Sequence, residues 1–333
     1  MDAAVAGLLG EAMEGNLVKR VTVLMAVYNS PLGMLDEAVD SILGQSHRDF
    51  EFLIVDDGST DEQVRQHLAR RASEDCRMRI VWEPHRGLTK SLNCGLALAE
   101  GEWIARQDAD DWSSPERLAR QVAYVEQHPE VRLCGSNART HQQNRAALWS
   151  TELPRTRHAL LEAFPRGNPF VHGSVLFHKD TVNALGGYRE AFPCSQDYDL
   201  FWRVTERHEA VNLPEPLYHY RYTSGSISAG RALDQLRAHM AIRALALSRQ
   251  TGVEMELSSA LEQAEQGAAR PAAVLRAMLK QADHTMLAGD YARAWRLYLE
   301  LLGGHMQCPL AWGKLLRLAL FQTIPGSRQV CFR

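Results

Sequence analysis

The sequence predicts an α/β protein with a mostly parallel central sheet, followed by a helical C-terminal region. Over about the first 135 residues, short apolar runs alternate with segments of helical spacing, which is typical of repeated β-α-β units. From Leu233 to Phe321 the patterns are helical, apart from a polar break around residues 251–271. We therefore expect one domain over residues 1–230 and a helical region over residues 231–333.

The elements of the first domain follow from their apolar patterns. Nearly continuous apolar runs such as Val21–Val27 (VTVLMAV) indicate strands buried on both faces, whereas amphipathic helices repeat every three to four residues. In chain order we expect strands at Val21–Val27, Phe50–Val55, Met78–Trp82, Trp103–Ala105, Val131–Cys134, Ser174–Phe177 and Leu217–Tyr222. Helices are expected at Met34–Leu43, Thr89–Ala99, Ser114–His128 and Gln196–Val204.

Two helix starts have recognisable capping signals. Ser59 and Glu62 have the spacing of a capping box, in which each side chain bonds to the other residue's backbone N–H. They predict a further helix after the second strand. Ser114-Pro115-Glu116 combines a capping residue, a proline for the first turn and an acid near the positive end of the helix dipole.

Polar residues follow three of the predicted strands. They are Tyr28-Asn29, Asp56-Asp57 and Asp108-Ala109-Asp110-Asp111. Ligands of open α/β sheets bind beyond the carboxyl ends of the strands, so we expect these residues to form one site. Carboxylates gathered there repel one another unless a cation or N–H donors compensate their charge. The pattern therefore favours a divalent metal ion that also binds a phosphate ligand.

Four motifs together resemble those of family 2 glycosyltransferases with the GT-A (Rossmann-like) fold, over roughly residues 20–228. The motifs are Ala26-Val27-Tyr28-Asn29, Val55–Asp61 (VDDGSTD), Ala105–Asp111 (ARQDADD) and Gln196–Leu200 (QDYDL). The resemblance implies an inverting, metal-dependent transfer of a sugar from a nucleotide-sugar, expected to be a UDP-sugar, to a hydroxyl of a glycan or lipid-linked oligosaccharide. It further implies a place in bacterial cell-surface polysaccharide biosynthesis.

The resemblance implies roles for the acidic residues at the strand ends. Asp110 would coordinate Mn²⁺ or Mg²⁺, and Asp108 would support the ribose or a metal-bound water. In an extended segment these two side chains point the same way. Asp57 would accept the imide N–H of uracil. The alternatives are a solvated turn for the Asp-x-Asp and a turn-stabilising carboxylate for Asp57.

Further residues are candidates for binding the nucleotide-sugar. Lys90 and Asn93 begin a helix whose N–H groups suit a diphosphate. Arg221 precedes a Ser-Gly-Ser turn and matches a family region that can close over the diphosphate, although a plain surface turn is an equal alternative. His172 lies where the family often has a residue near the donor sugar or the acceptor; a structural histidine is the alternative. The remaining donor candidates are Ala26, Tyr28, Asn29 and Ala109.

Asp197 is the candidate general base implied by the resemblance. Inversion needs a carboxylate that takes the proton of the acceptor hydroxyl as the oxygen attacks the anomeric carbon. An ordinary aspartate, with a pKa near ~3.9, is a weak base for an alcohol, so its position matters more than its pKa. Asp197 and Asp199 are two apart on a helix and cannot both face the site. The alternative is a carboxylate that only stabilises the helix start. Most family members have Glu at the position of Gln196.

Composition and charge exclude several classes of protein. The 333 residues have 37 basic and 40 acidic side chains, and a net charge of −3 argues against a nucleic-acid binder. No segment reaches the ~20 apolar residues of a membrane span, and the first 15 residues lack the basic start of a signal peptide. Six cysteines without a CxxC pair are expected to be reduced. We expect a cytoplasmic protein.

The charge is unevenly distributed along the chain. The first 300 residues have 33 basic and 40 acidic side chains, a net charge of −7, whereas the last 33 have a net charge of +4. Within this tail, residues 310–321 have the pattern of a basic amphipathic helix, which can lie on an anionic membrane surface. Peripheral contact with the inner face of a membrane is one prediction, and packing on the core is the alternative.

Two other functions fit parts of the pattern. A nucleotidyltransferase that makes nucleotide-sugars shares the sheet and the acidic edge, but the chain has no Gly-rich signature loop near its start. A non-catalytic glycan-binding or scaffold module would not need the full set of Asp57, Asp110 and Asp197. Both are kept as alternatives to the glycosyltransferase.

Overall fold

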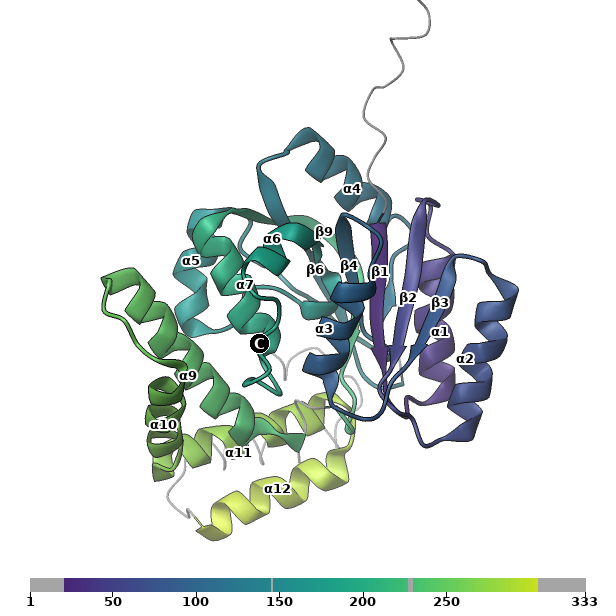
Figure 1. The fold of residues 1–333 in the computed structure, drawn as a ribbon. Helices are drawn as coiled ribbons and strands as arrows, with labels where there is room; N and C mark the ends of the chain where they lie inside the picture. Colours follow the sequence, from purple (N-terminus) through teal and green to yellow (C-terminus); the bar gives the residue numbers. More distant parts are fainter. Residues whose placement is uncertain (1–20, 145, 227–229, 305–333) are drawn as a thin grey trace, which may run out of the picture.

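A computed structural model describes residues 21–144, 146–226 and 230–304 (Figure 1). The strands are β1 Val21–Val27, β2 Phe50–Asp56, β3 Met78–Trp82, β4 Trp103–Gln107, β5 Trp112–Ser113, β6 Val131–His141, β7 Ala147–Ser150, β8 Leu176–His178 and β9 Glu209–Arg221. The helices up to residue 207 are α1 Leu32–Leu43, α2 Glu62–Glu74, α3 Leu88–Leu98, α4 Arg117–Gln127, α5 Arg157–Ala163, α6 Lys179–Ala184 and α7 Gln196–Arg207, with short 3-10 turns at Phe164–Arg166 and His172–Ser174.

The strands form one sheet in the order β3-β2-β1-β4-β8-β6-β9-β5, with β7 beside β6. The first four strands of this order pair in parallel. Strand β8 is antiparallel to both β4 and β6, and β6 pairs in parallel with β9. Six of the nine strands in the described residues therefore run in one direction. The predicted α/β fold with a mostly parallel sheet is confirmed.

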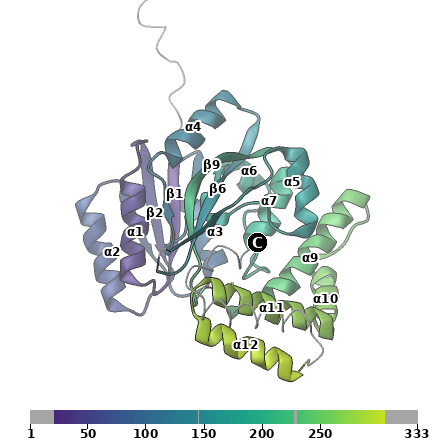
Figure 2. The same ribbon diagram turned by 180° about the vertical axis from the view of Figure 1, so that it is seen from behind.

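The central strands are buried on both faces, as their apolar runs predict. Alternate side chains of β1 enter two different cores. Leu24 packs in a core with α3 and α7, and Val23 and Met25 pack in a core with α1, α2 and α4. Figures 1 and 2 show these helices on opposite faces of the sheet. Helices on both faces leave the carboxyl ends of the strands as the open edge.

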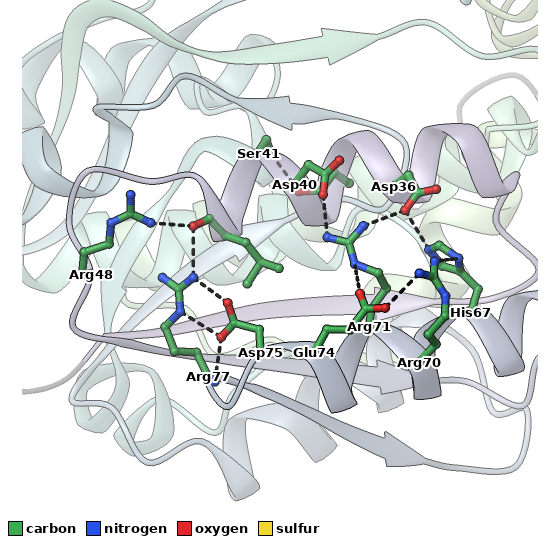
Figure 3. A network of polar contacts seen from close by, with 12 residues as sticks. Asp36, Asp40, Ser41, Arg48, His67, Arg70, Arg71, Glu74, Asp75 and Arg77 are labelled. Atoms are coloured by element: carbon green, nitrogen blue, oxygen red, sulfur yellow. Dashed lines mark hydrogen bonds and ion pairs between the residues drawn. The ribbon is translucent and has the colours of Figure 1, made fainter.

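A charged network joins α1 to α2 on the outside of the sheet (Figure 3). Arg71 of α2 lies 2.8 Å from Asp36 and 2.5 Å from Asp40 of α1, and His67 Nε2 lies 2.8 Å from Asp36. Partly exposed pairs of this kind contribute about 0–1 kcal/mol each. The network therefore orients the two helices, and the apolar core provides most of their stability.

Most predicted elements of the first domain are present within a few residues, but the capping box is wrong. Asp61 caps α2, with its Oδ1 accepting the Gln63 N–H at 2.9 Å. Ser59 Oγ instead accepts the Asn29 N–H at 2.9 Å, and the Ser59 N–H donates to Asp56 at 2.7 Å. Ser59 thus joins the ends of β1 and β2. The helix predicted from Ser114 begins at Arg117, without a side-chain cap.

Four helices follow the sheet in the described residues. They are α9 Ala232–Thr251, α10 Leu257–Ala268, α11 Pro271–Leu287 and α12 Tyr291–Gly304. Helix α10 occupies the predicted polar break, which is therefore wrong. Helix α9 packs on α7, α10 and α11, and α11 pairs with α12 around Leu279, Ala282 and Tyr298 (Figure 1). The predicted basic helix at residues 310–321 lies outside the described residues.

The predictions of reduced cysteines and of no membrane-spanning segment can be compared with the residues that the structure describes. Cys76, Cys94, Cys134 and Cys194 are free thiols, as expected. No helix within residues 21–144, 146–226 and 230–304 combines the length and apolar character needed to cross a bilayer.

Candidate active site

A cleft of about 830 Å³ opens at the carboxyl ends of β1, β2 and β4. Nine of the twelve predicted site residues line it, namely Ala26, Tyr28, Asn29, Asp57, Lys90, Asp108, Ala109, Asp110 and Arg221. Three others, Asn93, His172 and Asp197, are not part of its wall. The edge predicted from the strand ends is therefore a real cavity.

Asp57 is held by the loop that follows β3. Its Oδ1 accepts the Arg86 N–H at 2.8 Å, its Oδ2 accepts the Gly87 N–H at 2.9 Å, and His85 Nδ1 lies 2.9 Å from Oδ2. The His85 ring also stacks on Tyr28, with ring centroids 4.0 Å apart. Sequence reasoning missed His85 and Arg86. Their position directly after a parallel strand is the same signal that identified the aspartates.

Asn29, which lines the cleft, connects the ends of two strands. Its backbone has a φ of +47°, a left-handed conformation that asparagine tolerates better than most residues. Its side-chain Oδ1 accepts the N–H groups of Thr60 (2.8 Å) and Asp61 (3.0 Å). This amide fixes the loop after β2, and with it the position of Asp57.

Three carboxyl groups gather where β4 ends. Asp108 pairs with the buried Arg106 guanidinium. Burial, and then the charge of Asp108, raise the pKa of Asp110 to about 6. Burial and the charges of its two neighbours also raise the pKa of Asp111, whose Oδ1 accepts the Arg221 N–H at 2.6 Å. Arg106 pairs with Asp108, and Arg221 only partly offsets the rise in the pKa of Asp110, so the repulsion among these carboxyl groups fits an additional cation.

The same arrangement limits what could hold a metal ion. Within the described ranges, no cluster of three or more His, Cys, Asp or Glu side chains could hold a metal ion without ligands from outside the protein. Mg²⁺ and Mn²⁺ commonly take one or two carboxylates, and the other ligands are phosphates and water. Asp108 and Asp110 therefore fit a metal that arrives with a phosphate ligand.

Gly173 leaves room for this acidic group. Gly173 packs against Tyr218, and the Tyr218 hydroxyl accepts the Asp108 N–H at 3.2 Å. A Cβ on Gly173 would lie 1.9 Å from that hydroxyl and 2.8 Å from Asp108 Oδ2. Tyr218 is fully buried and cannot move aside. Glycine is thus required for close packing behind Asp108.

We expect Gly173→Ala to impair both stability and activity. Forcing a methyl group into this packing costs about 1–3 kcal/mol of unfolding free energy and displaces Asp108. Urea unfolding and a transfer assay measure the two effects. Gly33→Ala is the matched control, because a Cβ there meets no atom within 4 Å. Equal stability of the two variants would contradict this account.

Asn93 and His172 are not among the residues that line the cleft. Asn93 donates to the Tyr188 carbonyl (2.8 Å) and accepts the Tyr188 N–H (3.0 Å), so its amide holds the chain after α6. His172 Nε2 lies 3.2 Å from the Tyr188 hydroxyl. Burial, and then Arg106, lower the pKa of His172, while Asp197 and Asp108 oppose this change. His172 is thus influenced by the charges of both aspartates.

Asp197 lies in the first turn of α7, four residues after Pro193, which lines the cleft. Its Oδ2 accepts the Asn168 amide N–H at 2.7 Å, and its side chain is partly exposed. Asp199 is instead buried against Arg203 (2.7 Å) and Arg189 (3.0 Å). Only the first of the two helical aspartates is therefore available to a ligand, as the predicted helix geometry requires.

The C-terminal helices contact the rim of the cleft. Ser226, which lines the cleft, is 2.9 Å from His284 Nε2 of α11, and Arg293 of α12 donates to the Ser224 carbonyl at 3.2 Å. Burial, and then the charge of Lys280, lower the pKa of His284 to about 4. Its ring also meets Tyr222 edge-on. His284 is therefore neutral when it joins α11 to the cleft.

We expect His284 to make the fold sensitive to acid. The unfolded chain protonates this histidine below its ordinary pKa of 6.5, whereas the folded protein does so only near 4. Stability is thus complete above pH 6.5 and falls toward pH 4, by about 2 kcal/mol between pH 7.5 and 5. Urea unfolding at both pH values should show a smaller loss in His284→Gln than in the wild type. An unchanged loss would contradict this role, and His158→Gln, at an exposed site, is the control.

Comparison with known proteins identifies the class of this fold and site. The model of the glycosyl transferase family 2 matches residues 22–184. The chain belongs to this family, and it is a glycosyltransferase. The nucleotidyltransferase and the non-catalytic module are therefore set aside.

Two bacterial glycosyltransferases of polysaccharide biosynthesis are similar to this chain in sequence. The amylovoran biosynthesis glycosyltransferase AmsE of Erwinia amylovora is 30% identical over 234 residues, covering 69% of this chain and 87% of AmsE. The O-antigen biosynthesis glycosyltransferase WbnJ of Escherichia coli is 29% identical over 212 residues, covering 63% of this chain and 82% of WbnJ.

Solved structures share the GT-A fold. Residues 1–349 of TarS of S. aureus, in complex with UDP-GlcNAc, have a TM-score of 0.59 at 16% identity, covering 84% of this chain and 83% of that fragment. The mannosyltransferase PcManGT of Pyrobaculum calidifontis, in complex with GDP-Man and Mn²⁺, has a TM-score of 0.54 at 18% identity, covering 94% of this chain and 83% of the other. The predicted fold is confirmed.

Proposed function

We propose that this glycosyltransferase is inverting and metal-dependent and moves a sugar from a UDP-sugar to a hydroxyl of a glycan or lipid-linked acceptor in cell-surface polysaccharide biosynthesis. The observation that carries the proposal is the gathering of Asp57, Asp108 and Asp110 at one cleft. The amylovoran and O-antigen relatives support the pathway class, and the neighbour with bound UDP-GlcNAc supports the donor.

The proposed donor site uses the Asp57 end of the cleft for the base. Two backbone N–H groups hold the Asp57 carboxylate, and a carboxylate can accept the imide N–H of uracil. Tyr28 is half exposed and presents an aromatic face on which a base can stack. Ala26, Asn29 and Ala109 would complete this wall.

The proposed diphosphate site lies at the Asp110 end of the cleft. Asp110 and Asp108 would hold Mn²⁺ or Mg²⁺, and a metal ion bound there neutralises charge on the leaving diphosphate. The ammonium of Lys90 lies 3.9 Å from Glu190, and both side chains line the cleft. Arg221 pairs with Glu37 and lies over the Trp112 ring. These basic groups would add positive charge beside the phosphates.

Asp197 is the proposed general base. Asn168 holds one carboxylate oxygen, and within the described residues the other oxygen has no hydrogen-bond partner. In the reaction, Asp197 takes the proton of the acceptor hydroxyl while that oxygen bonds to the anomeric carbon. The bond from this carbon to the nucleotide breaks on the opposite face, and the nucleoside diphosphate leaves. His172 would lie near the transferred sugar.

We also propose separate roles for the two regions of the chain. Residues 1–230 would bind the donor and carry out the transfer, and residues 231–333 would contact the acceptor or a membrane. Co-sedimentation with anionic liposomes tests the membrane contact. Lys314→Glu together with Arg317→Glu should weaken binding if the basic tail is the anchor, and unchanged binding would exclude it.

A donor panel tests the proposed function. Purified protein is incubated with UDP-, GDP- and dTDP-sugars, with Mn²⁺, Mg²⁺ or EDTA, and nucleotide release is measured. We expect release from a UDP-sugar with metal and little release with EDTA. Full activity in EDTA would contradict the metal, and preference for another nucleotide would contradict the assigned donor.

A further inference from the structure

One short stretch of chain, residues 168–173 (NPFVHG), contacts two aspartates of the proposed reaction, and we call it the bridging segment. At one end, the side-chain amide of Asn168 donates to Asp197 Oδ2 at 2.7 Å. At the other end, Gly173 packs so closely that an added Cβ would lie 2.8 Å from Asp108 Oδ2. The Cα atoms at the two ends of the segment are at most ~18 Å apart. The segment therefore limits the separation of the proposed base and a proposed metal ligand.

The amide of Asn168 is held with its N–H groups toward Asp197. Its Oδ1 accepts the Phe170 N–H at 3.2 Å, so the oxygen and the nitrogen of the amide have different partners. Asn168 also precedes Pro169, and a residue before proline favours an extended backbone. The amide therefore cannot turn over without losing both hydrogen bonds.

The bridging segment is joined to helix α7 by a second contact. Phe170 is buried, and its ring centroid lies 5.6 Å from that of Phe201 in α7. Asp197 and Phe201 are one turn apart on the same face of this helix. Two alternate residues of the segment thus contact one face of α7. The position of Asn168 relative to Asp197 is therefore fixed by the core as well as by the hydrogen bond.

The backbone of the bridging segment is also held by the sheet and by its own turn. The Pro169 carbonyl accepts the side-chain amide of Asn212, a buried residue of β9, at 3.0 Å. The Val171 carbonyl accepts both the N–H and the hydroxyl of Ser174, each at 2.9 Å. The segment is therefore a rigid support for the side chain of Asn168.

An unsupported aspartate carboxylate has no fixed orientation. The torsion about its Cβ–Cγ bond is broad, so both oxygens sample many directions. A hydrogen bond from Asn168 to Oδ2 of Asp197 removes this freedom and does not occupy the other oxygen. A displacement of about 1 Å in a reacting group can lower a rate by about 10²-fold. The support that Asn168 gives is thus large enough to affect catalysis.

We propose that Asn168 is a positioning residue that directs the Asp197 carboxylate at the acceptor hydroxyl, and that the bridging segment fixes this base relative to Asp108. The inference rests on the proposed function, because it takes Asp197 as the general base. Asn168 exchanges no proton in this reaction. Its contribution is therefore expected in kcat, and only through Asp197.

A double-mutant cycle separates this role from a structural one. At saturating donor and acceptor, Asn168→Ala should lower kcat by about 10–100-fold and leave both KM values nearly unchanged. In an Asp197→Asn background the same change should alter kcat by no more than about twofold, because no base is left to position. Asn183→Ala, at an exposed site on α6, is the matched control and should behave as the wild type.

A second variant keeps the test valid if Asn168→Ala folds poorly. Asn168→Asp retains an oxygen that can accept the Phe170 N–H but loses the donor to Asp197. Urea unfolding measures the stability of both variants. We expect Asn168→Asp to fold and to lose kcat at least as strongly as Asn168→Ala.

Three outcomes would overturn the inference. Wild-type kcat in either folded variant would show that Asp197 needs no support from Asn168. An equal loss of kcat in the wild-type and Asp197→Asn backgrounds would make Asn168 a purely structural residue. A raised KM at unchanged kcat would make it a binding residue. Failure of the proposed function is distinct, because Asp197→Asn alone would then keep near-normal kcat.

Discussion

Replacing Asp197 by asparagine is expected to lower kcat by about 10²–10⁴-fold, the usual contribution of a general base. An amide has nearly the same shape and can still contact Asn168, which now bonds to the carboxylate at 2.7 Å. It cannot take the proton of the acceptor hydroxyl. Donor KM should change little, because the proposed nucleotide site is formed by residues of the cleft wall, which does not include Asp197.

The control for this prediction is a second acid in the first turn of a helix. Asp180 has this position in α6, where it is exposed and does not line the cleft. Asp180→Asn should keep normal kcat. A folded Asp197→Asn protein with near-normal kcat would show that Asp197 only stabilises the start of α7. Circular dichroism and urea unfolding establish that both variants are folded.

Replacing Asp110 by asparagine is expected to lower kcat/KM by about 10²–10³-fold. A metal ion on a phosphoryl group contributes several kcal/mol to the transition state, and each 1.36 kcal/mol is a factor of ten in rate. The variant should fold, because an amide removes the repulsion between Asp108 and Asp110. Thermal unfolding with UDP and Mn²⁺ should show stabilisation of the wild type and little stabilisation of the variant.

Asp49→Asn, in an exposed loop, is the matched control for Asp110→Asn and should behave as the wild type. Equal stabilisation of wild type and Asp110→Asn by UDP and Mn²⁺ would mean that the metal, if bound, does not use Asp110. Loss of activity in Asp110→Asn with intact stabilisation would assign this residue to the chemistry and not to metal binding. Both outcomes contradict the proposed role.

The strand ends were predictable from the sequence because parallel strands leave their following residues at one edge. The sequence alone therefore places Asp57, Asp108 and Asp110 at one edge, and all three line the cleft. The capping box was not predictable in this way. Ser59 has the right spacing for a cap, but its hydroxyl is used by the Asn29 N–H across two strands. A contact between residues far apart in the sequence therefore replaced the local capping interaction that the spacing predicts.

The contacts among the C-terminal helices were less accessible to sequence reasoning. Lys280 and Gln235 are 45 residues apart and share no motif, and only the packing of α11 on α9 brings them together. Helix α10 lies in a stretch whose polar residues suggest a break, because its buried face is made of small side chains such as Ala260 and Ala264. Alanine contributes little to an apolar pattern, although it packs closely against α9.

The anomeric configuration of the product tests the central claim most directly. The preferred nucleotide-sugar, of known configuration, is transferred to an acceptor in the presence of metal, and the new linkage is assigned by NMR. A single displacement with Asp197 as base predicts the configuration opposite to that of the donor, and EDTA should abolish the product. A product that retains the donor configuration would contradict the proposed mechanism.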